Sequence, residues 1–178
     1  MATTEQGGIG SDAALDIYID GLKNAHALEK QATQLINRQL ERIEHYPAVE
    51  TLLRTHLGET EAQIARLDEI LASFGEEHST LKDIATSLTG NLAALGHTVM
   101  GDEILKNHFA NHAFENFEIA SYLSLVALAE ASGRAGHVGM LEASLGEERK
   151  TAQALHDMTG DLTRAYVARR VSGAKADR

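Results

Sequence analysis

Apolar residues recur at intervals of three and four along most of this chain, which is the spacing that one face of an α-helix produces. The first such stripe predicts a helix that is capped by Ser11 or Asp12 and ends at Tyr46, where a proline follows. The second stripe predicts a helix over residues 49–74, closed by Gly75. Because the turn between the two stripes is short, we expect these helices to lie antiparallel.

The second half of the chain predicts another pair of helices, over residues 102–132 and 136–160, with a weaker helical stretch after them. Residues 75–101 contain four glycines and a short helical stretch at 81–88, and they are numerous enough to cross the length of a bundle. Hairpin, long crossover and hairpin is the connectivity of ferritin-like folds. We therefore predict an all-α, ferritin-like four-helix bundle with one long crossover between its second and third helices, plus short accessory helices.

The composition agrees with one helical domain. The chain has 178 residues with one proline and 4% aromatic residues, which favours helices over β-structure. We assign residues 1–10 to a flexible N-terminus, 11–165 to the bundle and 166–178 to a polar C-terminal tail.

Charge and residue types exclude several classes of function. A net charge of −10 makes the phosphate backbone of nucleic acids an unsuitable partner. The absence of cysteine excludes disulfides and thiolate metal sites. We find no signal peptide and no apolar stretch long enough to span a bilayer, so we expect a cytoplasmic protein with no membrane partner.

The informative residues are acids that fall on the apolar stripes. Each predicted helix carries at least one near its middle: Glu29, Glu59, Glu115 with Glu118, and Glu148. Burying one ionised carboxylate costs several kcal/mol, and five together would repel one another. Two divalent cations would offset most of this charge, and Fe²⁺ or Mn²⁺ suits carboxylate and imidazole ligands. The pattern predicts a di-metal site, while for any one glutamate the simpler alternative is a packed stem with its carboxylate in water.

The histidines do not follow the spacing that is usual in di-iron bundles. That spacing is Glu-x-x-His, whereas Ala62, Glu118 and Thr151 stand three residues after Glu59, Glu115 and Glu148. We therefore interpret the polar residues beside the acids as packed or supporting residues: His56, Gln63, His112 and Tyr122. A metal site made by His108 and His112, one turn apart, is a weaker alternative.

Four stretches of the chain together resemble a known family. They are ALEKQATQL (27–35), HLGETEAQIARLDEILASFG (56–75), ENFEIASYLSL (115–125) and LEASLGEERKTAQAL (141–155). In order and spacing they are similar to the YciE/YciF-type ferritin-like stress proteins, over residues 12–165. The resemblance implies a four-helix ferritin-like fold, often dimeric, with a rubrerythrin-like di-metal centre and a link to stress responses and peroxide chemistry.

The resemblance also implies a set of metal ligands. Matched residue by residue, it carries that role to the five stripe glutamates, Glu29, Glu59, Glu115, Glu118 and Glu148. The chain departs from the family at Asn116, where His is common, at Phe117, which replaces Tyr, and at Gly146, which replaces an acid.

We therefore expect a metal-dependent redox protein with two Fe or Mn ions that acts on peroxide or oxygen. The competing hypothesis is a non-enzymatic helical stress protein whose metal is structural or absent, and an iron-storage cage is a third. Apolar residues beside the main stripes of the first two helices also predict a homodimer through that hairpin; they include Ile17, Ile19, Leu35 and Leu53.

Overall fold

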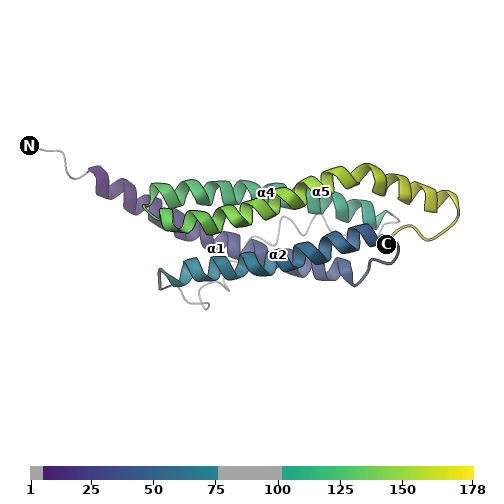
Figure 1. Ribbon diagram of the computed structural model, residues 1–178, viewed down its shortest axis with the longest axis horizontal. Helices are drawn as coiled ribbons and strands as arrows, with labels where there is room; N and C mark the ends of the chain where they lie inside the picture. Colours follow the sequence, from purple (N-terminus) through teal and green to yellow (C-terminus); the bar gives the residue numbers. More distant parts are fainter. Residues whose placement is uncertain (1–5, 76–101) are drawn as a thin grey trace, which may run out of the picture.

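A computed structural model describes residues 6–75 and 102–178 of the chain. Within these residues, four long helices lie side by side along one axis (Figure 1). They are α1 (Gln6–Leu40), α2 (Pro47–Ala72), α4 (Glu103–Ala131) and α5 (Val138–Val171), with the short 3₁₀ turn η2 (Ala135–His137) before α5. The predicted all-α, ferritin-like bundle of two hairpins is confirmed. The crossover and the short helix predicted at 81–88 lie outside the described residues.

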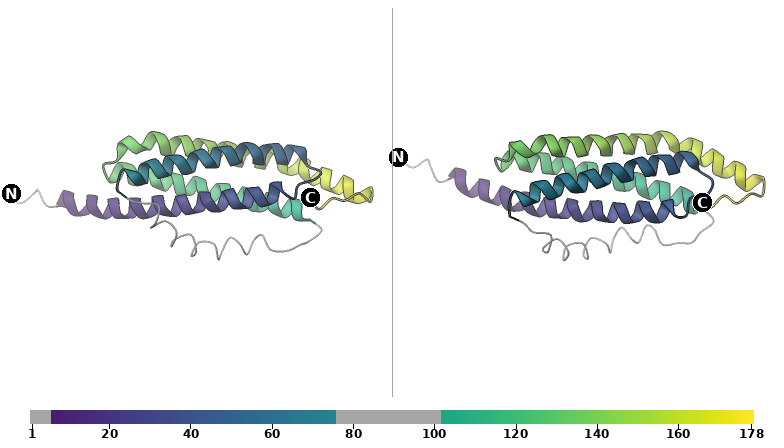
Figure 2. Two further views of the ribbon diagram at one scale, coloured as in Figure 1. Left: turned by 90° about the horizontal axis from the view of Figure 1, so that it is seen from below. Right: turned by 60° about the horizontal axis from the view of Figure 1, so that its bottom comes forward.

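The four helices do not pack equally closely. The helices within each hairpin, α1 with α2 and α4 with α5, pack closely, and α1 also packs closely against α4. The α2–α5 side is the most sparsely packed of the four. Two further views show the same arrangement of two antiparallel pairs (Figure 2).

The first hairpin turns earlier than the apolar pattern predicts. The helix α1 begins at Gln6 and ends at Leu40, whereas the pattern predicts a start at Ser11 or Asp12 and an end at Tyr46. Tyr46 is instead the N-cap of α2, with the proline in its first turn. That position suits proline because it has no amide hydrogen to donate and its φ is already helical.

The helical stretch predicted after residue 160 is confirmed, but it is continuous with the last helix, which runs through Gly160 to Val171. Tertiary packing explains the difference, because Leu162 is buried and joins a core cluster with residues of three other helices. Burial of that side chain outweighs the cost of about 1 kcal/mol for a glycine inside a helix. The helix ends instead before Gly173, whose φ of 76° lies in the left-handed region that glycine adopts easily.

The residues after α5 return to the bundle. The hydroxyl of Tyr46 donates a hydrogen bond to the carbonyl of Ala176 at 2.6 Å. The amide of Ile104, in the first turn of α4, donates to the carbonyl of Asp177 at 2.9 Å. This second bond satisfies one of the amides that a helix start leaves without a partner.

The apolar core is divided along the bundle axis. One cluster contains Tyr18, Leu22, Leu67, Ile70, Leu125 and Leu141, and another contains Ile36, Val49, Leu53, Ile104 and Leu162. On every helix, the acids singled out from the sequence lie between the members of these two clusters. The fold therefore places a polar layer between two apolar ones.

The first hairpin offers less exposed apolar surface than the sequence predicts. Leu53 is fully buried in the core, while Ile19 and Leu35 are half-buried. Of the four residues from which the dimer surface was predicted, Ile17 alone is exposed, at 58%.

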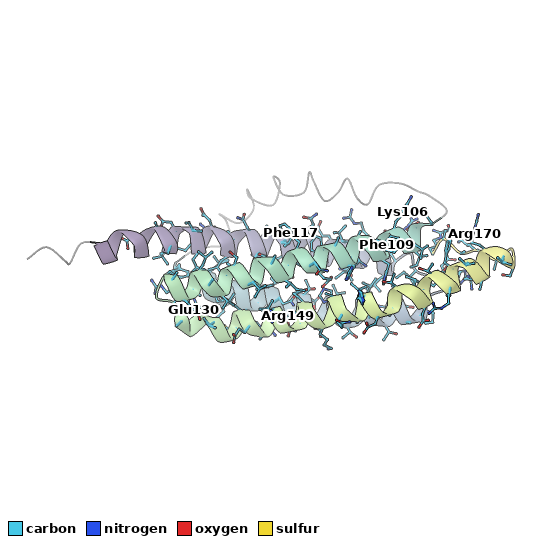
Figure 3. The ribbon with its side chains drawn as sticks, turned by 90° about the horizontal axis from the view of Figure 1, so that it is seen from above. Lys106, Phe109, Phe117, Glu130, Arg149 and Arg170 are labelled. Atoms are coloured by element: carbon cyan, nitrogen blue, oxygen red, sulfur yellow. The ribbon has the colours of Figure 1, made fainter. Side chains whose placement is uncertain are left out.

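A larger apolar surface lies on α4. Phe109, Phe117 and Leu123 are 52%, 52% and 46% exposed, and Figure 3 labels both phenylalanines on this helix. From residue 107 to 129 the helix carries two charged residues, Glu115 and Glu118, and both are buried. Its outer face is therefore uncharged over several turns. Among the described residues, no helix is both long and apolar enough to cross a membrane.

We expect the homodimer to form through this face of α4, because two chains of charge −10 repel each other least where neither presents a charge. Light scattering should give a mass of about twice the 19.2 kDa of one chain. The Phe117→Glu change should weaken dimerisation at least tenfold, and Ile17→Glu is the matched control on α1. A monomeric wild type, or dissociation by Ile17→Glu alone, would contradict this prediction.

Candidate metal centre

The polar layer contains acids from all four helices and one histidine. Each lies on the inner face of its helix, since the apolar stripe of that helix continues on both sides of it. Five of these side chains are at most 4% exposed: Glu29 on α1, His56 on α2, Glu115 and Glu118 on α4, and Glu148 on α5.

Four of them form one tight group. A ligand atom of each of His56, Glu115, Glu118 and Glu148 lies within 4.8 Å of the ligand atoms of the other three. The Nε2 atom of His56 is 3.2 Å from a Glu115 oxygen and 3.9 Å from a Glu148 oxygen. The structure thus brings together three of the five predicted ligands and adds a histidine that the sequence analysis had taken for a supporting residue.

Glu29 on α1 lies outside the tight group, but its charge interacts with those of His56 and Glu115. Its Oε1 atom accepts a hydrogen bond of 2.6 Å from the hydroxyl of Tyr122. Burial raises the pKa of Glu29 to about 7, although the Tyr122 hydrogen bond and the charge of His56 both lower it. Burial and the charge of Glu29 raise the pKa of Tyr122 above its usual range, so this hydroxyl keeps its proton.

Glu59 lies at the edge of the centre. Its side chain is 18% exposed, and it is not among the four residues of the tight group. One of its oxygens is 3.1 Å from the Nζ atom of Lys150, and the other is 3.5 Å from Nδ1 of His56. Glu59 therefore connects the buried group to the surface of the bundle.

The carboxylates of the centre have few hydrogen bonds. Six of their buried oxygens lack a well-directed partner in the described part of the chain: one each on Glu29 and Glu115 and both on Glu118 and Glu148. Glu115 and Gln63 approach Glu148, and His56 approaches Glu115, but these contacts lack the geometry of a well-formed hydrogen bond. Buried polar atoms in native proteins are nearly always satisfied, and each exception needs an explanation such as an ion. This deficit fits a bound cation, and oxygen with imidazole donors suits iron or manganese.

Protons are the alternative to a cation at this site. Burial and then the hydrogen bond and charge of Glu115 raise the pKa of Glu148 to about 11, although Gln63 lowers it. Burial and then the charges of Glu29 and Glu148 raise the pKa of Glu118 well above its ordinary value. The raised pKa values favour the protonated form of these carboxyls in the metal-free protein, and a binding cation would displace those protons.

The pKa of His56 is raised, although burial alone would lower it. Burial lowers the pKa of this imidazole, but the hydrogen bond and charge of Glu115, with the charges of Glu29 and Glu59, outweigh it. The net pKa of His56 is raised, which favours its protonated form beside the carboxylates. The hydroxyl of Thr151 lies 3.1 Å from its other ring nitrogen, Nδ1.

The remaining polar residues singled out from the sequence are placed differently. Gln63 is completely buried beside Glu148. His112 lies outside the ligand group, with its ring 5.9 Å from that of His156. His108 contacts the hydroxyl of Thr159 at 2.9 Å. Neither His108 nor His112 belongs to the cluster that the described residues form.

The sequence analysis missed the residues that support the centre from α2 and α5. Arg66 makes two hydrogen bonds with Glu147, of 2.7 and 2.8 Å, and also donates to the hydroxyl of Ser144 at 3.1 Å. Ser144 in turn lowers the pKa of Tyr122 by hydrogen bonding. The spacing of Arg66 and Glu147 on the charged flanks of their stripes gives no sign of this contact, because it depends on how the two helices are rotated.

The chain is similar to known proteins over most of its length and over most of theirs. The family described as "Domain of unknown function (DUF892)" matches residues 13–168. Protein YciF of Escherichia coli strain K12 is 28% identical over 151 residues, which cover 80% of this chain and 88% of that protein.

Solved structures resemble the bundle over most of its length. A protein of Xanthomonas campestris pv. campestris has a TM-score of 0.74 at 27% identity, covering 88% of this chain and 98% of that one. The E. coli stress protein YciF has a TM-score of 0.65 at 24% identity, covering 82% and 94%. At that identity, the likeness to the E. coli structure concerns the fold alone.

The raised pKa values predict how the metal-free protein responds to pH. A carboxyl that keeps its proton when folded and loses it when unfolded lowers the free energy of unfolding by about 1.4 kcal/mol per pH unit. For Glu118 this loss starts near its ordinary pKa of 4.5 and continues as pH rises. In urea unfolding with chelator present, Glu118→Gln should therefore gain stability over the wild type from pH 5 to 8. The exposed Glu61→Gln is the control, and parallel pH profiles for wild type and Glu118→Gln would refute the burial argument.

Proposed function

The chain belongs to the family described as a domain of unknown function, DUF892, and from this and its buried cluster we propose that it is a metal-dependent redox protein. In this proposal it binds two divalent ions, Fe or Mn, and reduces peroxide or oxygen in a stress response. The link to a stress response is supported by the similar E. coli protein YciF, which is described as a stress protein.

One observation carries the proposal: the deficit of hydrogen bonds around the buried acids of α1, α4 and α5. A purely structural polar layer would pair these oxygens, because each unsatisfied buried group costs about 1–3 kcal/mol. Glu115, Glu118, Glu148 and His56 would surround a cation, and Glu29 and Glu59 on either side supply the further carboxylates that a second ion needs.

Bound Fe or Mn would supply the change of oxidation state that no side chain of this site provides. The side chains hold that centre and manage protons around it. Tyr122 fixes the orientation of Glu29 through its hydrogen bond. The apolar layers on both sides keep water from the inner carboxylates, and Glu29, with a pKa of about 7, can hold or give up a proton near neutral pH.

Two measurements distinguish this proposal from the alternatives. Protein purified without chelator should contain Fe or Mn at up to two ions per chain, and the loaded protein should consume peroxide. Metal without peroxide or oxygen consumption would favour a structural metal in a non-enzymatic stress protein, and absence of metal would refute the proposal. A very large closed particle that accumulates iron would instead indicate storage.

Metal binding should stabilise the bundle more strongly at higher pH. Protons held by Glu29, Glu118 and Glu148 compete with the cation, and they leave as pH rises. At one hundred times the dissociation constant, a ligand adds about 2.7 kcal/mol of stability. The increase in melting temperature caused by Mn²⁺ should therefore be larger at pH 7.5 than at pH 5.5.

The control for this measurement is Glu118→Gln, which removes one ligand and one competing proton. It should show a smaller increase with Mn²⁺ at both pH values. An equal increase at the two pH values in the wild type would indicate binding elsewhere on the acidic surface.

A further inference from the structure

Two ion pairs join α2 to α5 across the most sparsely packed side of the bundle. Arg66 pairs with Glu147, and Lys150 pairs with Glu59. Both pairs lie beside Glu148, since Glu147 precedes it in the chain and Lys150 follows two residues later. They therefore border the stretch of this side that lies over the candidate metal centre.

The two ion pairs differ in strength. The Arg66 guanidinium makes two parallel bonds to Glu147, and both side chains are only about a quarter exposed. A bidentate pair of this kind is geometrically fixed and strong for an ion pair. Lys150 is 72% exposed and makes one contact of 3.1 Å, and exposed single pairs contribute at most about 1 kcal/mol. The Arg66–Glu147 pair is therefore the more stable link between the two helices, and the Lys150–Glu59 pair opens more readily.

The more exposed pair, Lys150–Glu59, includes the glutamate that connects the surface of the bundle to the buried centre. From Lys150, the contacts run through Glu59 to Nδ1 of His56 at 3.5 Å, and from Nε2 of His56 to Glu115 at 3.2 Å. Glu59 is more exposed than the other four stripe glutamates, so an ion from solvent meets it first.

We propose that metal ions enter the centre at Glu59, and that Lys150 controls this entry by occupying one oxygen of the Glu59 carboxylate and placing a positive charge beside it. Opening of the ion pair frees Glu59 to bind an incoming cation and pass it to the buried carboxylates. This inference rests on the proposed function, and it makes Lys150 a positioning residue that touches no metal itself.

The test measures the rate at which metal-free protein takes up Mn²⁺, by stopped-flow competition with a metal-sensitive fluorescent chelator at low salt. Lys150→Gln should load at least threefold faster than the wild type, and Lys150→Arg, which restores the charge, should load at the wild-type rate. Glu59→Gln should load at least tenfold more slowly. Arg149→Gln removes the adjacent positive charge, which Figure 3 labels on α5, and should leave the rate unchanged.

The outcomes separate this inference from the proposed function. If the wild type binds Mn²⁺ but Lys150→Gln and Arg149→Gln load at the same rate, the entry role of Lys150 is wrong while the metal centre stands. If equilibrium titration detects no Mn²⁺ binding to the wild type, the proposed function fails first. Unfolding of the metal-free variants by urea checks that altered loading does not come from altered stability.

Discussion

The crowding of buried carboxylates around His56 is the constraint on which the rest of this structure depends. Each buried charge costs several kcal/mol, against a total stability of about 5–15 kcal/mol for a typical domain. Without a cation, the protein lessens that cost by retaining protons on Glu118 and Glu148 and by raising the pKa of His56. The two apolar layers must offset what is left, which explains why the polar layer lies between them.

His56 also explains how the centre departs from the usual order of di-iron bundles. Where that order places a histidine three residues after Glu148, this chain has Thr151, and its hydroxyl contacts the His56 ring. The imidazole thus comes from α2, one turn before Glu59. Residues three apart share a helix face, so His56 and Glu59 point toward the same part of the bundle. In the proposed metal centre, a histidine followed by a glutamate on α2 would take the place of the usual glutamate followed by a histidine, so both carboxylate and imidazole donors would still be present.

Much of the fold could be predicted because an apolar stripe is a local property of each helix. The stripe glutamates could be predicted for the same reason, since an acid in an apolar stripe breaks the pattern at its own position. The continuity of α5 through Gly160 could not be predicted, because Leu162 continues the helix through contacts with distant residues that outweigh the local preference of Gly160. The position of His56 among the candidate ligands and the Arg66–Glu147 pair could not be predicted either. Both depend on how two helices are rotated relative to each other, and the apolar stripe of one helix carries no information about that rotation.

For an ion to reach a buried site in a helical bundle, one side of the bundle must open more easily than the others, and here the most sparsely packed side is the one between α2 and α5. The other three sides of this bundle are more closely packed, and opening them would expose core residues to water at about 25 cal/mol per Å². Over the centre, the α2–α5 side is joined by the strong Arg66–Glu147 pair and by the exposed Lys150–Glu59 pair, and the second pair exchanges its protein partner for water at little net cost. Its opening therefore does not require the apolar layers to separate. In the proposed entry route, the sparse packing that leaves Glu59 partly exposed would let an ion reach the centre while the apolar layers stay together.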